Sequence, residues 1–139
     1  MSTLTAHFDL PLDGSAPRWA RSAVTAVLGG WGLRDRAWLD DAAAVISELV
    51  TNAVKHGGGE VVVGVEAYGD QVVVSVADGS SVVPRRREPD GTGGLGLRII
   101  EALTVRWYVE PHEGGKRVRA ELPVCPGDPV AAGGTSRTS

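Results

Sequence analysis

The segment from Val45 to His56 constrains the fold most, because helical spacing divides it into two faces of opposite chemical character. Its apolar residues recur at intervals of three and four, as they do along one side of an amphipathic helix. These residues are Ile46, Leu49, Val50, Ala53 and Val54. The opposite side carries Glu48, Asn52 and His56 at a spacing of about one helical turn. A carboxylate one turn before a carboxamide places a proton acceptor beside a hard oxygen ligand for Mg²⁺, which suits phosphoryl transfer. The alternative is the solvated face of an ordinary surface helix.

Length and composition predict one folded domain that needs no covalent staple. A chain of 139 residues buries roughly two thirds of its unfolded surface. The only cysteine is Cys125, which rules out an internal disulfide and fits a reducing compartment. Residues 126–139 are small and polar and predict a disordered tail, so we expect the domain to occupy residues 1–125.

Charge and hydropathy limit the partners that the chain is expected to have. Fourteen basic against seventeen acidic residues give a net charge of −3, without the basic excess that holds a nucleic-acid backbone. No stretch resembles a secretory signal or is long and apolar enough to cross a bilayer. We therefore expect a cytoplasmic protein that binds neither nucleic acid nor membranes.

The start of the chain predicts an edge strand followed by a helix. Residues 6–11 alternate weakly in polarity, as an exposed edge strand does. Asp13 or Ser15, with Pro17 just after them, supplies a helix start. This first helix should run to about Leu28, where a cluster of glycines follows.

A second helix should begin at Asp35 or Asp40 and continue through the two-faced segment to the glycines at residues 57–59. Three tryptophans lie around the two helices, and we expect them to fill the core because large rings on amphipathic helices usually do so. They are Trp19, Trp31 and Trp38.

Two valine-rich runs, residues 60–68 and 71–77, predict a β-hairpin. Alternation places one set of valines on the inner face: Val61, Val63 and Val65 in the first strand, and Val72, Val74 and Val76 in the second. The next residue on that face is Asp78. A buried charge without a partner is costly, so either the strand has ended and Asp78 is solvated, or Asp78 meets a specific donor such as a ligand amine.

The rest of the chain predicts a long loop, a short helix and two strands. Residues 79–94 are polar and rich in glycine and proline, which predicts a loop of the length that functional loops often have. A helix is predicted over residues 95–103, and strands near residues 104–110 and 116–122. The apolar face of the first of these strands is Val105, Trp107 and Val109.

Residues 91–96 match the glycine pattern of dinucleotide-binding folds, and Glu110 follows at a suitable distance. That fold requires a buried strand before the first glycine, whereas residues 84–90 are charged and bounded by prolines. No segment has the glycine and lysine pattern of a P-loop either. The remaining interpretation is a glycine loop whose amides bind phosphate oxygens at a helix start, with an ordinary glycine-rich loop as the alternative.

Three features therefore occur in a fixed order: a helix with Glu48 and Asn52, a strand that ends at Asp78, and a glycine loop before a short helix. This order resembles the ATP-binding fold shared by sensor histidine kinases, type II topoisomerases, mismatch-repair ATPases and Hsp90-type chaperones, known as the Bergerat fold. The segment from Ser47 to His56 is most similar to the bacterial anti-sigma-factor serine/threonine kinases. The similarity covers about residues 8–122.

The resemblance implies an α+β fold, namely a two-layer α/β sandwich in which helices cover one face of a mixed β-sheet, with ATP and Mg²⁺ bound between the layers. Asn52 then corresponds to the residue that coordinates Mg²⁺, and Glu48 to the one that accepts the proton of the attacking hydroxyl. Asp78 corresponds to the acceptor of a hydrogen bond from the adenine amino group. His56 borders the pocket, and Leu97 belongs to the nucleotide-binding set. The glycines that would approach the phosphates are Gly93, Gly94 and Gly96.

Two residues depart from the pattern of the family near the adenine. Ser80 stands where the wider fold commonly has a second glycine after Asp78, and Arg117 stands where a threonine near the adenine is common. We therefore expect an affinity for ATP that is low or that depends on a partner. The basic run at residues 85–87 is interpreted as a solvated part of the loop, with contacts to phosphates or an acidic partner as the alternative.

The function implied by the resemblance is that of an ATP-binding regulatory protein, an anti-sigma factor and serine/threonine kinase. Such a protein binds a sigma factor and phosphorylates an anti-sigma-factor antagonist protein, and a homodimer is compatible with this role. One alternative is a non-catalytic or weakly nucleotide-binding module of the same fold that only sequesters a regulator. Another is a detached ATPase domain of a histidine kinase, which would form acid-labile phosphohistidine on a separate partner.

Overall fold

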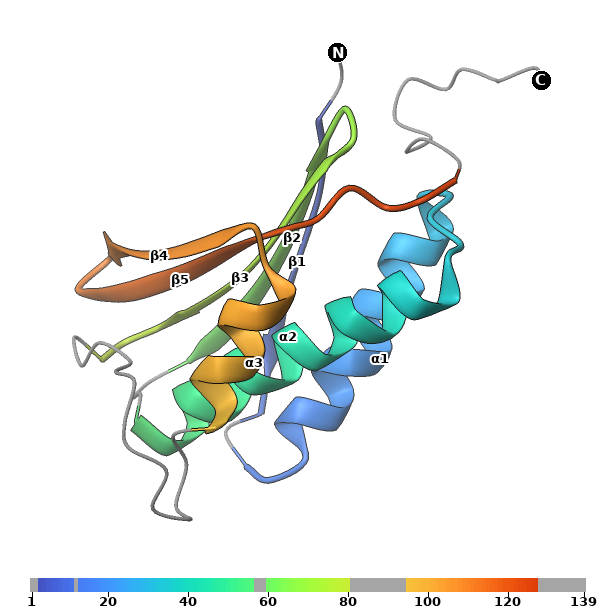
Figure 1. Cartoon of the computed structure of the whole chain (residues 1–139). Coiled ribbons are helices and arrows are strands. Elements are labelled where there is room, and N and C mark those ends of the chain that lie inside the picture. Colours follow the sequence, from blue (N-terminus) through green and yellow to red (C-terminus); the bar gives the residue numbers. More distant parts are fainter. Residues whose placement is uncertain (1–2, 12, 57–59, 81–94, 128–139) are drawn as a thin grey trace.

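The computed structural model describes residues 3–11, 13–56, 60–80 and 95–127. They form a two-layer α+β sandwich, in which three helices cover one face of a five-stranded sheet (Figure 1). The elements in chain order are β1 (Thr3–Leu10), α1 (Ala16–Gly30), α2 (Arg36–His56), β2 (Val61–Tyr68), β3 (Gln71–Asp78), α3 (Leu95–Leu103), β4 (Arg106–His112) and β5 (Gly115–Leu122). The predicted fold class is confirmed.

The sheet has the strand order β1-β2-β3-β5-β4, and every described strand pair is antiparallel. The prediction of a mixed sheet is therefore wrong for the described strands. The reason lies after β3, where α3 leads to β4 at the sheet edge and β5 then returns between β4 and β3. As a result β3 and β4 run in the same direction without being neighbours. This topology places β5 directly beside β3.

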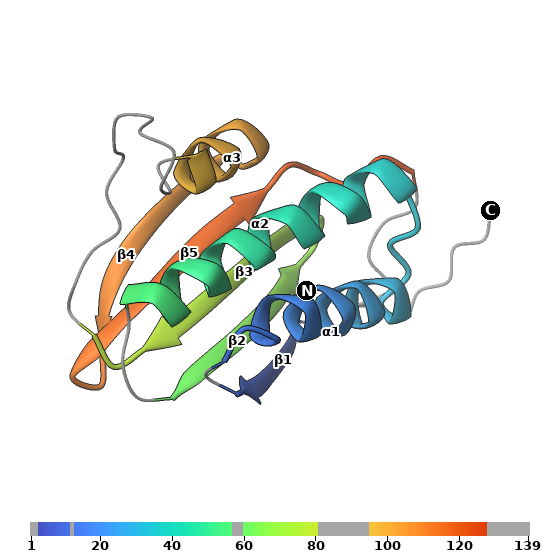
Figure 2. The same ribbon diagram turned by 90° about the horizontal axis from the view of Figure 1, so that it is seen from below.

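The core lies between the two layers and consists of the apolar faces that the sequence predicts. In Figure 2 α2 lies between α1 and α3, over the middle of the sheet, and it contacts both helices. The predicted stripe of α2 is at most 4% exposed at Ile46, Leu49, Val50 and Ala53, whereas Val54 is only partly buried. The inner valines of the central hairpin are at most 1% exposed. They are Val61, Val63, Val65, Val72, Val74 and Val76.

Aspartates lie just before α1 and α2, but only the one before α2 caps its helix. The Oδ1 atom of Asp35 accepts a hydrogen bond from the backbone N–H of Trp38 at 2.8 Å, so Asp35 rather than Asp40 caps α2. Before α1, hydrogen bonds from the hydroxyl and the backbone N–H of Ser15 lower the pKa of the Asp13 carboxyl. The predicted helix start at Asp35 is therefore confirmed, whereas Asp13 contacts Ser15 and makes no side-chain cap to α1.

Element boundaries differ most from prediction at the edges of the sheet. β1 begins at Thr3 and pairs with β2 along its whole length, so it is longer than the predicted strand. β4 begins two residues later than predicted, because the hydroxyl of Thr104 donates to the carbonyl of Ile100 at 2.7 Å and closes the end of α3. Val105 therefore lies outside β4 and is 60% exposed, although the sequence groups it with the apolar face of the predicted strand. α1 extends to Gly30 rather than ending at Leu28.

The three tryptophans behave differently from one another. Trp38 is 6% exposed, and its Nε1 donates to the carbonyl of Pro123 at 2.6 Å, which joins α2 to the segment after β5. Trp31 packs against the core, as predicted. The prediction is wrong for Trp19, which is 60% exposed. The reason is that the buried stripe of α1 repeats every four residues from Ala16, and Trp19 lies off that stripe.

Replacing Trp38 with phenylalanine is expected to lower the free energy of unfolding by about 1 kcal/mol or more, because the hydrogen bond to Pro123 is lost along with some packing. Urea denaturation followed by circular dichroism measures the change. The matched control is Trp19→Phe on the exposed side of α1, for which we expect a change within about 0.5 kcal/mol. Equal effects of the two substitutions would contradict the assigned role of Trp38.

The segment after β5 closes the core, and Cys125 within it is 7% exposed. Residues 128–139 lie outside the described residues, so the predicted tail over 126–139 and the domain boundary at residue 125 stay predictions. Within the described part of the chain, none of the helices has the combination of length and apolar character needed to cross a membrane.

Candidate functional site

Three segments that the sequence singles out come together at one end of the molecule. The C-terminal end of α2, the end of β3 and the start of α3 lie at this end in both views (Figures 1 and 2). α2 also contacts β3, β5 and α3. The fold thus brings together segments that lie far apart in the sequence.

Glu48 and Asn52 lie one turn apart in the second half of α2, and both are half-buried. Ser47, next to Glu48, accepts a hydrogen bond at its Oγ from Arg21 Nη1 of α1 at 3.1 Å. The carbonyl of Ser47 accepts a hydrogen bond from the Thr51 hydroxyl at 2.8 Å. These contacts hold the turn of α2 that carries Glu48, whose side chain is half-buried.

The chemistry of this pair fits a magnesium ion held mainly by substrate phosphates. Mg²⁺ prefers hard oxygen ligands and commonly keeps only one or two from the protein, the others coming from phosphates and water. Asn52 supplies a single amide oxygen, and Glu48 supplies a carboxylate one turn away. The residues present therefore fit a Mg²⁺–nucleotide complex.

Asp78 is not solvated at the end of β3, because its side chain is only 1% exposed. Its specific donor is a residue of the same chain. The Nζ atom of Lys116 lies 2.9 Å from Oδ1 and 2.9 Å from Oδ2 of Asp78, and the Lys116 side chain is 7% exposed. The backbone N–H of Ser80 donates to Asp78 Oδ1 at 2.7 Å. Of the two alternatives open from the sequence, the structure shows a buried carboxylate with a specific donor.

The pairing of β3 with β5 produces this contact. Asp78 lies directly opposite Lys116 in the register, and both continue the inner faces of their strands. The inner face of β5 also carries Val118, Ala120 and Leu122, all at most 5% exposed. The ion pair therefore stands at the end of the apolar core, where water has little access and the two charges satisfy each other.

Gly115 permits the close approach of the two strands at this point. A Cβ atom built on Gly115 would lie 2.0 Å from the carbonyl oxygen of Asp78 and 2.6 Å from the Cα of Gly79. Both contacts are to backbone atoms, which cannot rotate away. Any side chain at residue 115 would therefore push β5 away from the end of β3.

Replacing Gly115 with alanine is expected to lower the free energy of unfolding by about 1–3 kcal/mol, because the added methyl group overlaps the backbone of β3. Chemical denaturation measures the loss. Gly29→Ala is the matched control, since a Cβ there meets nothing within 4 Å and the helical site should gain up to about 1 kcal/mol from the better helix former. If the two substitutions had the same effect, the close approach at Gly115 would not be a constraint on the fold.

Arg117 pairs with Ala77, next to Asp78, but its side chain does not lie beside the Asp78 carboxylate. Its expected place near the adenine, beside that carboxylate, is therefore wrong. Arg117 points to the opposite face of the sheet, where it lies 3.5 Å from Glu110 and donates from Nη2 to Nε2 of His112 at 3.3 Å. The physical reason is alternation, since only one of two consecutive strand residues can face the helices. Lys116, which the sequence analysis did not single out, is the β5 residue that meets Asp78.

The other predicted site residues are only partly described. Leu97 is 5% exposed in the first turn of α3, so its side chain packs in the core at this end. His56 is the last residue of α2, and Gly96 lies in the first turn of α3. Gly93 and Gly94 lie outside the described residues.

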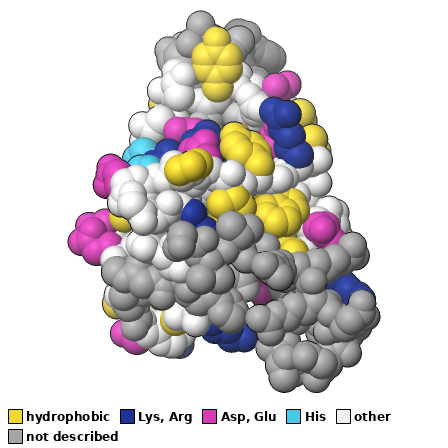
Figure 3. Space-filling model, turned by 90° about the vertical axis from the view of Figure 1, so that its left-hand side faces the viewer, with side chains coloured by type: hydrophobic (Ala, Val, Ile, Leu, Met, Phe, Trp, Pro, Cys, Tyr) yellow, Lys and Arg dark blue, Asp and Glu magenta, His cyan; other side chains and the backbone are white. Residues whose placement is uncertain are grey.

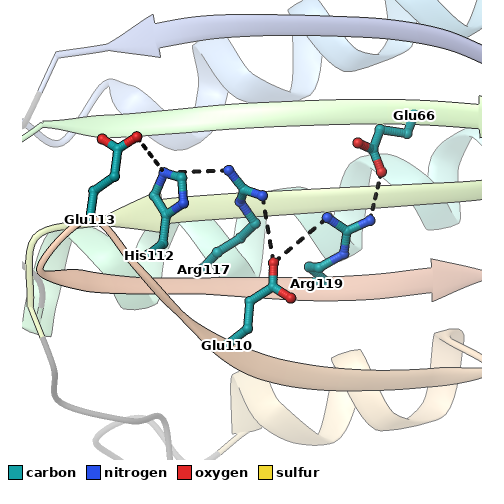
Figure 4. Close-up of polar contacts among 6 residues, drawn as sticks. All are labelled: Glu66, Glu110, His112, Glu113, Arg117 and Arg119. Atoms are coloured by element: carbon teal, nitrogen blue, oxygen red, sulfur yellow. Dashed lines mark hydrogen bonds and ion pairs between the residues drawn. The ribbon is translucent and has the colours of Figure 1, made fainter.

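The face of the sheet away from the helices carries a separate polar network (Figure 4). Arg119 Nη2 forms an ion pair with Glu66 Oε1 at 2.6 Å, and Arg119 Nη1 lies 3.8 Å from Glu110 Oε2. Glu110 also forms an ion pair with Arg117. Burial alone would lower the pKa of Arg119, but the hydrogen bond and the charge of Glu66 raise it above the usual value. This network faces away from α2, so it is not part of the candidate site.

Figure 3 views the molecule from the end where the candidate site lies. Acidic and basic side chains are intermixed on the part of this surface that belongs to the described residues.

Comparison with known protein families identifies the family of this chain. The family model described as "Histidine kinase-like ATPase domain" matches residues 11–122. The chain therefore belongs to the histidine kinase-like ATPase domain family. This confirms the resemblance inferred from the helix with Asn52 and the strand that ends at Asp78.

A solved structure shares the fold. The chain is similar to the crystal structure of the RsbU and RsbW domains of Rv1364c from Mycobacterium tuberculosis, with a TM-score of 0.65 and 24% identity over 87% of this chain. It spans 32% of the length of that protein chain. It also matches the histidine kinase domain of the blue-light activated histidine kinase EL346 from Erythrobacter litoralis, with a TM-score of 0.47 and 21% identity, covering 82% of this chain and 61% of that one. No curated protein sequence matches the chain.

Proposed function

We propose that this chain is an ATP-binding regulatory protein, an anti-sigma factor that also acts as a serine/threonine kinase on an anti-sigma-factor antagonist protein. One observation carries the proposal. In a member of the histidine kinase-like ATPase family, the half-buried Glu48 and Asn52 lie in the second half of α2. The C-terminal end of that helix lies at the same end of the molecule as the end of β3 and the start of α3. A kinase requires a metal ligand and a proton acceptor side by side, and these two residues provide them.

The proposed nucleotide site uses residues from all three segments. Asn52 holds Mg²⁺, which when bound neutralises charge on the phosphate oxygens. His56 and Leu97 border the nucleotide, and Asp78 lies at the base end of the site. The amides of the glycine loop bind the phosphates with support from the start of α3. These glycines are Gly93, Gly94 and Gly96.

In the proposed reaction Glu48 accepts the proton of a serine or threonine hydroxyl of the antagonist protein. The hydroxyl oxygen forms a bond to the γ-phosphorus of ATP, and the bond from that phosphorus to the bridging oxygen of ADP breaks. The products are a phosphorylated antagonist, ADP and one proton, held first by Glu48. A base placed in this way contributes about 10²–10⁴-fold to the rate.

The proposed partners are a sigma factor and its antagonist protein in the cytoplasm. Support comes from the similarity to the structure of the RsbU and RsbW domains, together with the resemblance of the segment around Glu48 and Asn52 to anti-sigma-factor kinases. Phosphate on the antagonist would switch binding by adding charge and acceptor oxygens at its interface. A homodimer is part of the same proposal.

Incubation with radiolabelled ATP, Mg²⁺ and a panel of candidate antagonist proteins tests this function. The expected result is acid-stable label on serine or threonine of one antagonist, together with loss of its binding to the chain. Acid-labile label on histidine of a partner would instead support a histidine-kinase activity. Absence of any label across the panel would argue against a kinase.

A second function is favoured by the pairing of Asp78 with Lys116. The carboxylate expected to contact the base is engaged within the protein, which suits a module that binds nucleotide weakly and acts by sequestering a regulator. The two functions differ in whether regulation requires phosphoryl transfer. The substitution Glu48→Gln distinguishes the two functions, because only a kinase would lose its regulatory activity with the loss of transfer.

A further inference from the structure

The carboxylate of Asp78 has its accessible acceptor sites filled by its own chain. Lys116 Nζ is equally distant, at 2.9 Å, from both carboxylate oxygens, so the ammonium group stands in front of the carboxylate. The Ser80 backbone N–H takes a further site on Oδ1 at 2.7 Å, and Lys116 also donates to the Ser80 carbonyl at 3.4 Å. The Asp78 side chain is only 1% exposed, so no open side is left for another donor.

A base amino group and a lysine ammonium group are both hydrogen-bond donors and compete for the same acceptor. To donate to Asp78, the amino group of adenine would have to displace Lys116 from a buried pair. Breaking such a pair leaves two charges with poor access to water, and this costs more than one new hydrogen bond to the base returns. The exchange is therefore unfavourable.

We propose that Lys116 is a specificity-determining residue of the nucleotide site, which occupies the donor position on Asp78 so that the amino group of the base is not recognised there. The nucleotide is then held mainly by its phosphates and by Mg²⁺ at Asn52. This inference rests on the proposed nucleotide binding and adds that the site discriminates poorly between purine bases.

Calorimetric titration with two nucleotides tests the inference. Inosine triphosphate carries an oxygen in place of the 6-amino group of ATP, so the ratio of the two Kd values reports whether the amino group is recognised. For the wild-type chain with Mg²⁺, we expect ATP to bind no more than about threefold more tightly than inosine triphosphate, less than one hydrogen bond to a charged group provides.

Lys116→Thr is expected to change this ratio, because the shorter side chain releases Asp78 and leaves room for a donor beside it. The variant should prefer ATP over inosine triphosphate by about tenfold or more, the effect of one hydrogen bond to a carboxylate. Arg117→Thr is the matched control, since it removes a neighbouring cation from the opposite face of β5 and should keep the wild-type ratio. Lys116→Gln, which keeps a donor near Asp78, should also keep a ratio near that of the wild type.

The outcomes separate this inference from the proposed function. A wild-type preference for ATP of about tenfold or more, or an unchanged ratio in Lys116→Thr, would overturn the role of Lys116 while leaving nucleotide binding intact. If Lys116→Thr does not fold, the ratio of the two Kd values for the wild-type chain alone decides whether Lys116 prevents recognition of the amino group. Binding that appears only in Lys116→Thr and favours ATP supports the inference. No binding of either nucleotide to any folded variant would overturn the proposed function and the inference together.

Discussion

Replacing Asp78 with alanine is expected to lower the free energy of unfolding by about 3–5 kcal/mol, because Lys116 would be left buried without its counter-charge. The Lys116 side chain is 7% exposed, and its Nζ contacts both oxygens of Asp78. The Ser80 carbonyl at 3.4 Å also accepts from Nζ, but it carries no counter-charge. Urea denaturation at neutral pH, followed by circular dichroism, measures the loss.

The double variant Asp78→Ala with Lys116→Met provides the decisive comparison. An apolar residue in place of the orphaned ammonium group removes the uncompensated charge, so the double variant should regain most of the lost stability. Asp9→Ala on the exposed side of β1 is the control for removing a carboxylate, with an expected change within about 0.5 kcal/mol. A double variant as unstable as Asp78→Ala would mean that the pair is not what holds this end of the sheet.

Replacing Glu48 with glutamine is expected to slow phosphoryl transfer to an antagonist protein by about 10²–10⁴-fold. Glutamine keeps the size of the side chain and its half-buried place on α2, but it cannot accept the proton of the attacking hydroxyl. Binding of Mg²⁺–ATP should stay within about threefold of the wild type, because proton acceptance contributes to the transition state rather than to the bound ground state. Single-turnover labelling measures transfer, and calorimetry measures binding.

Asp41→Asn is the matched control for this substitution. Asp41 lies on the exposed side of the same helix, nearer its start, so the change removes the same charge without touching the candidate site. Its transfer rate should equal that of the wild type. A Glu48→Gln variant that keeps full regulatory activity with no transfer at all would instead identify the chain as a sequestering module.

The buried face of each central element could be predicted from local periodicity in the sequence. The stripe through Ile46 and Val50 and the alternating valines before Asp78 each fix which face of an element is buried, because a shift of one residue would expose the whole set. The class of fold was implied by the resemblance to the Bergerat ATP-binding fold, not by periodicity. The aspartate cap at Asp35 is likewise a local signal, and it is confirmed.

Pairings between distant segments could not be predicted in the same way. Asp78 and Lys116 meet only because β5 inserts between β3 and β4, and strand order is not encoded in the alternation of any single strand. The incorrect prediction of a mixed sheet also reflects the missing strand order. Once β5 is placed, alternation alone assigns Lys116 to the inner face and Arg117 to the outer one. Trp19 was misplaced for a different reason, since the small residues of α1 rather than its large ring face the core.

Calorimetric titration of the wild-type chain with ATP, in Mg²⁺ and again in excess EDTA, tests the central claim most directly. The claim is that the end of the molecule between α2, β3 and α3 binds a Mg²⁺–nucleotide complex through Asn52. It predicts saturable binding of one nucleotide per chain in Mg²⁺ and a much weaker signal in EDTA. Absence of heat at millimolar ATP, or binding that is unchanged by EDTA, would contradict it.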